Sequence, residues 1–117
     1  DYNVSHSQLL IRSPSSRSDA DNLDIHFTCV KHMSIPTSFE GLLIHRMNAD
    51  ELTAASIAIA DGSDTLVFKI ESISGDGLIH ATHGVVRQNR LDMFESSLMY
   101  VNRDWPVEEY GVVLAWL

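Results

Sequence analysis

Alternating apolar and polar positions predict strands along most of the chain. Runs rich in Leu, Ile, Val and Phe are separated by clusters of Ser, Asp, Gly and Asn, at spacings typical of antiparallel sheets. The segments with this pattern are residues 8–12, 23–30, 41–47, 65–72, 77–86 and 111–117. We predict an α+β fold in a single domain over residues 1–117, with a mostly antiparallel sheet of about six or seven strands, curled or packed as a sandwich.

Residues 23–30 show the clearest alternation. The odd-numbered side chains from Leu23 to Cys29 fall on one face, and Asp24 and His26 fall on the other. This pattern predicts a half-buried strand in which the acidic side chain faces solvent and the cysteine is a small buried hydrophobe. The polar stretch that precedes the strand, residues 13–22, is expected to be an exposed loop.

The middle of the chain predicts one short helix near residues 49–60. Asn48 is a suitable N-cap with Glu51 at the third helical position, and five alanines follow between residues 49 and 60. The alternative is a strand over residues 56–60. The preceding segment, 41–47, carries apolar side chains on both faces, which indicates either a central strand or cover from another element.

Residues 65–72 and 77–86 predict a hairpin that turns at Gly75 and Asp76. In this register Ile70 faces Ala81, Phe68 faces His83 and Leu66 faces Val85 on the apolar side, while Glu71 faces His80 and Lys69 faces Thr82 on the polar side. His80 and His83 then project to opposite faces and cannot bind one metal ion together. A bulge at Gly84 would reverse this parity, and His26 or His45 would then be needed as further ligands.

The last third of the chain is less regular. Residues 93–101 fit a strand better than a helix, although Phe94 and Leu98 have helical spacing. Residues 111–117 form an apolar run that predicts a buried internal strand. The alternative is an edge strand that carries Trp116 near the surface and pairs with a second copy of the chain.

Composition restricts the possible partners. Sixteen acidic and eight basic side chains give a net charge of -8, which disfavours nucleic acid and would attract a basic protein. No stretch is apolar enough to span a membrane. Cys29 is the only cysteine, so no internal disulfide can form, and a reducing, cytoplasmic location is expected.

The sequence contains no phosphate loop, nucleophile elbow, zinc-protease motif or calcium loop, and we predict no catalytic set, metal or cofactor. The expected function is a non-enzymatic, acidic protein-binding domain that neutralises a basic partner. In size and charge the chain is similar to immunity proteins of bacterial toxin systems, a likeness that transfers no residues. The predicted contact surface consists of Asp19, Asp21, Asp24 and Glu71. Two alternatives are a self-associating accessory domain and a metal-assisted hydrolase that uses His26, His45 and His80.

Overall fold

The computed structural model describes residues 1–15, 21–92, 95–100 and 111–117. These residues form nine strands in two mostly antiparallel sheets and one short α-helix. The predicted α+β fold with a mostly antiparallel sheet is therefore confirmed. They divide into two compact units, which are described separately: unit 1 is Asp1–Cys29 with Gly84–Leu117, and unit 2 is Val30–His83. The single domain over residues 1–117 stays a prediction. None of the described helices has the length and apolarity needed to cross a bilayer.

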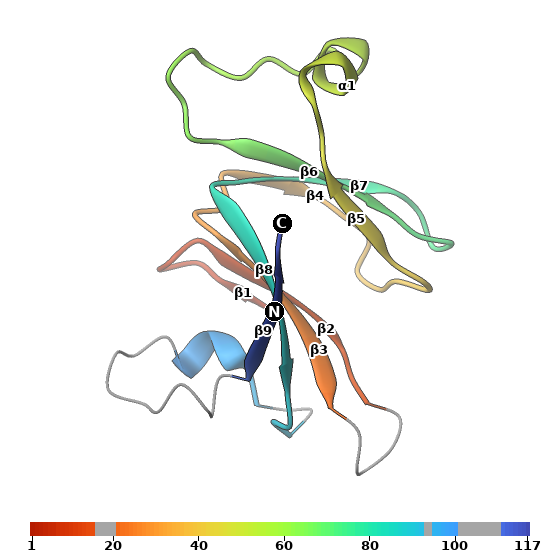
Figure 1. Ribbon diagram of the computed structural model, residues 1–117, viewed down its shortest axis with the longest axis vertical. Coiled ribbons are helices and arrows are strands. Elements are labelled where there is room, and N and C mark those ends of the chain that lie inside the picture. The colour runs from red at the N-terminus through yellow and green to blue at the C-terminus, as the bar shows by residue number, and fades with distance from the viewer. Residues whose placement is uncertain (16–20, 93–94, 101–110) are drawn as a thin grey trace. The chain divides into compact units, whose positions relative to one another are not determined.

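Unit 1 contains a five-stranded sheet in the order β1-β2-β3-β8-β9 (Figure 1). Its elements are β1 (Tyr2–Asn3), β2 (Gln8–Ser13), β3 (Asn22–Thr28), β8 (His83–Asn89), the 3-10 helix η1 (Ser97–Tyr100) and β9 (Val112–Trp116). Phe27 on β3 is fully buried, and its ring occupies the space where a side chain at Gly84 on β8 would lie. Burying such a ring contributes about 1.5–3 kcal/mol, and the missing side chain at Gly84 allows the close approach.

The prediction that β3 buries only one face is wrong, although Phe27 of the predicted inner face is buried. Asp24 and His26 are buried, Leu23 is exposed, and Cys29 lies past the end of the strand, where it is exposed and has a positive φ of 52°. A buried acid is tolerated only where partners compensate the loss of hydration. The partners of Asp24 come from segments far along the chain, so the alternation within β3 could not reveal them.

Unit 2 contains a four-stranded sheet in the order β4-β7-β6-β5 (Figure 1). Its elements are β4 (His32–Ser34), β5 (Leu43–Arg46), the helix α1 (Ala49–Ala54), β6 (Leu66–Glu71) and β7 (Gly77–Ala81). Phe68 and Ile70 of β6 and Ile79 of β7 are fully buried. The predicted hairpin is therefore present, with its apolar side chains on the predicted face.

The register of this hairpin differs from the prediction. Ile70 faces Gly77, Phe68 faces Ile79 and Leu66 faces Ala81. The turn lies earlier than Gly75 and Asp76, because the amide of Gly75 donates to the carbonyl of Ser72 and the Ser72 hydroxyl donates to the Gly75 carbonyl. The shift is by an even number of residues, so each side chain of β6 keeps its face while its partner changes.

The neighbours predicted for His80 and His83 are also wrong. His80 faces Val67 on one side and His32 on the other, rather than Glu71. The strand is interrupted at Thr82, after which β8 belongs to the other sheet, and His83 is exposed instead of lying beside Phe68. One continuous run of the sequence therefore supplies strands to two sheets.

Helix α1 confirms the helical interpretation of residues 49–60, although it ends at Ala54. Asn48 and Glu51 form the predicted capping box, and Ser56 adopts a positive φ of 56° just beyond the helix. Strand β5 lies at the edge of its sheet, so the predicted central position is wrong. His45 of β5 contacts Glu51 of α1, but α1 has no buried residue and Leu43 of β5 is exposed, so this contact does not bury the apolar side chains of β5.

Two expectations for the last third are wrong. Residues 97–100 form the 3-10 helix η1 rather than a strand, and Leu98 of this helix is buried. Residues 93, 94 and 101 of the predicted strand lie outside the described residues. Strand β9 exists, but it is an edge strand whose five residues are all exposed, not a buried internal strand. The exposure matches the alternative interpretation of this segment.

Candidate functional site

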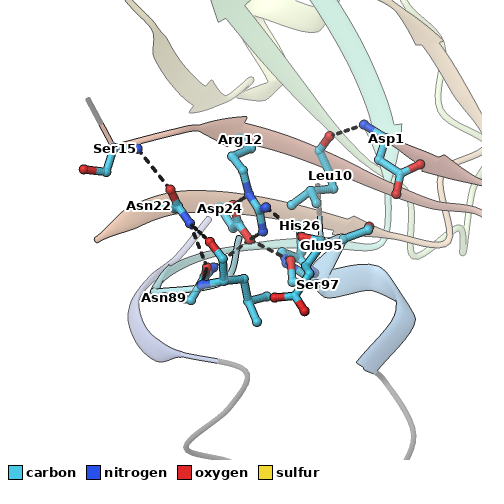
Figure 2. Close-up of polar contacts among 12 residues, drawn as sticks. Asp1, Leu10, Arg12, Ser15, Asn22, Asp24, His26, Asn89, Glu95 and Ser97 are labelled. Carbon is cyan, nitrogen blue, oxygen red and sulfur yellow. Dashed lines mark hydrogen bonds and ion pairs between the residues drawn. The ribbon is translucent and has the colours of Figure 1, made fainter. Parts of the chain in front are cut away.

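A buried polar network lies in unit 1 and is centred on Asp24 (Figure 2). We call it the Asp24 network; its members are Arg12, Asn22, Asp24, His26, Asn89 and Ser97. The Asp24 side chain has an exposed fraction of 0%. Its Oδ1 accepts from Nε of Arg12 at 2.6 Å, and its Oδ2 accepts from Nη2 of the same guanidinium at 2.7 Å. Ser97 Oγ and Asn89 Nδ2 each donate to Oδ2 at 2.7 Å, so the carboxylate accepts four hydrogen bonds.

Arg12 connects this carboxylate to the chain that follows β8. It lies directly opposite Asp24 in the β2–β3 pairing, which sets up the two parallel hydrogen bonds of the ion pair. Its remaining nitrogen, Nη1, donates to the carbonyls of Glu95 at 2.7 Å and Asp92 at 3.0 Å. The guanidinium therefore binds two carbonyls as well as the acid, and it anchors the segment that leads to η1.

A second branch of the Asp24 network runs through two asparagines. Asn22 Nδ2 donates to Oδ1 of Asn89 at 3.3 Å and to the carbonyl of Leu91 at 2.7 Å, while its Oδ1 accepts from the amide of Ser15. Asn89 Oδ1 also accepts from the amide of Leu91. These bonds hold the end of β8 against the start of β3.

The third branch brings together a serine, a histidine and an aspartate. His26 Nε2 lies 2.8 Å from Oγ of Ser97, whose hydroxyl donates to Asp24. Because that hydroxyl has a single proton, Nε2 of His26 must carry the proton of its own bond to the serine. The imidazole nitrogen that faces Ser97 is therefore a donor and cannot act as a base toward it. Ser97 also has an exposed fraction of only 1%, so this trio positions η1 and is not arranged for nucleophilic attack.

Charge and burial set the protonation states in the network. Burial alone would raise the pKa of Asp24, but hydrogen bonds from Arg12, Ser97 and Asn89 outweigh it and hold that pKa below its ordinary value. The same bond to Asp24 raises the pKa of Arg12. Burial, followed by the nearby positive charge of Arg87, lowers the pKa of His26 to about 4. The network consists of an ionised pair and a neutral imidazole at neutral pH.

The second feature of unit 1 is its exposed apolar edge. Strand β9 pairs with β8 alone among the described strands, and Val112, Val113, Leu114 and Trp116 are all exposed. The β8–β9 register shifts between Val86 and Arg87, so that one residue of β9 is extra at this point. A strand with exposed apolar side chains and no charged residue is a known site for pairing with another chain.

Unit 2 carries a charged surface beside α1. His45 Nε2 lies 3.0 Å from Oε1 of Glu51, and Lys69 Nζ donates to Oε1 of Glu71 at 2.8 Å. The hydrogen bond from Lys69 holds the pKa of Glu71 below its ordinary value, and the bond to Glu71 raises the pKa of Lys69. An open groove of about 610 Å³ adjoins this surface; it is lined by Ser34, Met47, Glu51, Ala54, Ala55, Lys69, Asp76, Gly77 and Leu78.

The four acids of the predicted contact surface have different surroundings. Asp24 is buried, so its predicted exposure is wrong. Asp21 binds Nε of Arg90 at 2.6 Å and also accepts from Gln88, and both bonds lower its pKa. Glu71 belongs to unit 2, where it binds Lys69 and lies 3.9 Å from His45. Asp19 lies outside the described residues.

Other residues that matter in the structure were not singled out from the sequence. The partners of Asp24, namely Asn89 and Ser97, are separated from it by 65 and 73 positions. One signal was available: the strands 8–12 and 23–30 are consecutive, and pairing them antiparallel places Arg12 opposite Asp24. Nothing comparable in the sequence pairs His32 with His80.

Comparison of the chain with protein-family models, curated proteins and solved structures finds no match.

Proposed function

We propose that this chain is a protein-binding domain that pairs its edge strand β9 with an extended segment of a basic partner. The observation that carries the proposal is the exposure of all five residues of β9 on a strand that pairs with only β8 among the described strands. Adding a strand to such an edge satisfies backbone hydrogen-bonding groups and covers apolar side chains at the same time. A cytoplasmic location, where a single cysteine stays reduced, belongs to the same proposal.

The net charge of -8 decides which occupant we propose. A second copy of the chain carries the same charge and is repelled, whereas a basic segment is attracted and its encounter is accelerated. The run from Gly111 to Leu117 contains no charged side chain, so the direct contact at β9 is apolar. The electrostatic attraction of the basic segment then comes from acidic side chains elsewhere in the chain. The irregular register near Val86 limits regular pairing to a short length, which favours a short segment over an extended strand.

The test uses the ¹⁵N-labelled chain and synthetic strand-forming peptides. A peptide of alternating valine and lysine should shift the amide signals of β9 and its neighbour β8, and the matched valine–glutamate peptide should not. The apparent Kd should rise severalfold when the salt concentration increases from about 0.05 M to about 0.5 M, because salt screens the attraction between the acidic chain and the basic peptide.

Two valines provide a matched pair of variants. Val112 of β9 has an exposed fraction of 68%, and Val4, which lies between β1 and β2, has one of 79%. Val112→Asp should weaken peptide binding at least about tenfold, and Val4→Asp should leave it unchanged. Equal effects of the two substitutions, shifts located away from β9, or equal binding of the acidic peptide would contradict the proposal. Sedimentation equilibrium that shows a dimer dissociated by Val112→Asp would identify a second copy as the occupant instead.

A further inference from the structure

Two histidines that are far apart in the sequence face each other in unit 2. His32 of β4 is directly opposite His80 of β7 in the antiparallel register, and the two strands are neighbours in the sheet (Figure 1). Directly opposed residues project to the same face of a sheet. Their ring centroids are 5.4 Å apart, and the ring planes are inclined at 82°.

This separation matches the geometry of two imidazoles that share one metal ion. A metal–nitrogen bond of about 2.0–2.1 Å and a nitrogen-to-centroid distance of about 1.1 Å place each centroid about 3.2 Å from the ion, so two rings at a tetrahedral angle are about 5.2 Å apart. The observed 5.4 Å is close to that value. Only side-chain rotation is needed, because the backbone already places the two residues opposite each other.

The two ligands differ in their exposure, because His80 lies half-buried on the inner strand β7. His32 is exposed at the edge of the sheet, where an ion can reach it. Two positions further along the same strands, Ser34 and Leu78 face each other and line the groove of about 610 Å³.

We propose that His32 and His80 form a two-histidine binding site for a divalent transition metal. Imidazole prefers Cu²⁺, Ni²⁺ and Zn²⁺ over Mg²⁺ and Ca²⁺, and affinity increases toward Cu²⁺ in this series. Within the part of the chain that the structure describes, no group of three or more His, Cys, Asp or Glu side chains is placed to hold a metal, so the proposed site has two protein ligands. The inference is independent of the function proposed for β9.

The test follows the imidazole signals of the full chain during titration with Zn²⁺. The ring ¹⁵N signals of His32 and His80 should shift together and saturate at one equivalent, and Mg²⁺ should produce no shift. In frozen solution, Cu²⁺ should show electron–nuclear couplings to two imidazoles. Bound Zn²⁺ should also raise the midpoint of thermal unfolding, because it binds the folded form.

Three variants separate this site from the other histidines. His32→Gln and His80→Gln should each weaken Zn²⁺ binding at least about tenfold, since each removes one of two ligands. His83→Gln, which changes an exposed histidine three positions from His80, should leave binding unchanged. His32 is exposed, so its replacement tests the site without disturbing the fold. Binding that survives His32→Gln, or that is lost in His83→Gln, would overturn the proposal.

Discussion

Replacing Asp24 with asparagine should destabilise unit 1 more than any change to an exposed ion pair. The substitution keeps the shape of the side chain but removes the charge opposite Arg12 and exchanges one acceptor oxygen for a donor group. Donors from Arg12, Ser97 and Asn89 then compete for one oxygen. Because Asp24 is fully buried, water cannot replace the missing acceptor.

The magnitude follows from the contacts. Breaking a buried ion pair costs about 3–5 kcal/mol. Arg12 keeps its two bonds to the carbonyls of Asp92 and Glu95, and 12% of its side chain remains exposed, which places the expected loss near the lower limit, about 3 kcal/mol. For a chain of this size the corresponding decrease in Tm is roughly 10 °C.

Asp21 provides the matched control, since it also binds an arginine at 2.6 Å. Its partner Arg90 has an exposed fraction of 80%, so Asp21→Asn should have a much smaller effect than Asp24→Asn. Urea unfolding followed by tryptophan fluorescence and circular dichroism measures both variants under identical conditions. A loss below about 1 kcal/mol for Asp24→Asn, or equal losses for the two variants, would refute the reasoning from burial.

Two further predictions concern His26 and Gly77. The pKa of His26 is about 4 in the folded chain and 6.5 in the unfolded chain, so the unfolded chain binds this proton at a higher pH. The contribution of His26 to the free energy of unfolding should therefore be fully present above pH 6.5 and fall by about 3 kcal/mol between pH 6.5 and pH 4. Urea midpoints across this pH range measure the loss, which should largely disappear in His26→Gln. A side chain at Gly77 would place Cβ 2.7 Å from the carbonyl oxygen of Ser34, so Gly77→Ala should cost about 1–3 kcal/mol and speed amide exchange in β4 and β7. Unchanged exchange rates would contradict this packing.

The local elements could be predicted because their causes are local. The capping box of Asn48 and Glu51 and the alanines after it suffice to start a helix, and alternating apolar residues identify the β6–β7 hairpin. The correct face of β6 followed from the two-residue period, which a register shift by an even number does not alter. The register itself depended on where the turn closes, and the hydrogen bonds between Ser72 and Gly75 decide that.

The candidate sites could not be predicted in the same way, because each depends on residues from distant segments. Polarity within β3 indicated that Asp24 faces water, and only Arg12, Asn89 and Ser97, gathered from other parts of the chain, make its burial favourable. His80 met His32 rather than Glu71 because β4 pairs with β7. The apolar composition of β9 indicated burial, whereas its position at the edge of the sheet left it exposed.

The sequence by itself therefore determined the longer strands, the short helix and the acidic charge, since each depends on neighbouring residues or on composition. The tertiary structure alone decided that Asp24 is buried, which histidines meet and which strand is left at an edge. The physical reason is that desolvation and pairing depend on what lies opposite a side chain in space, and strand order is set by contacts between residues far apart in the chain.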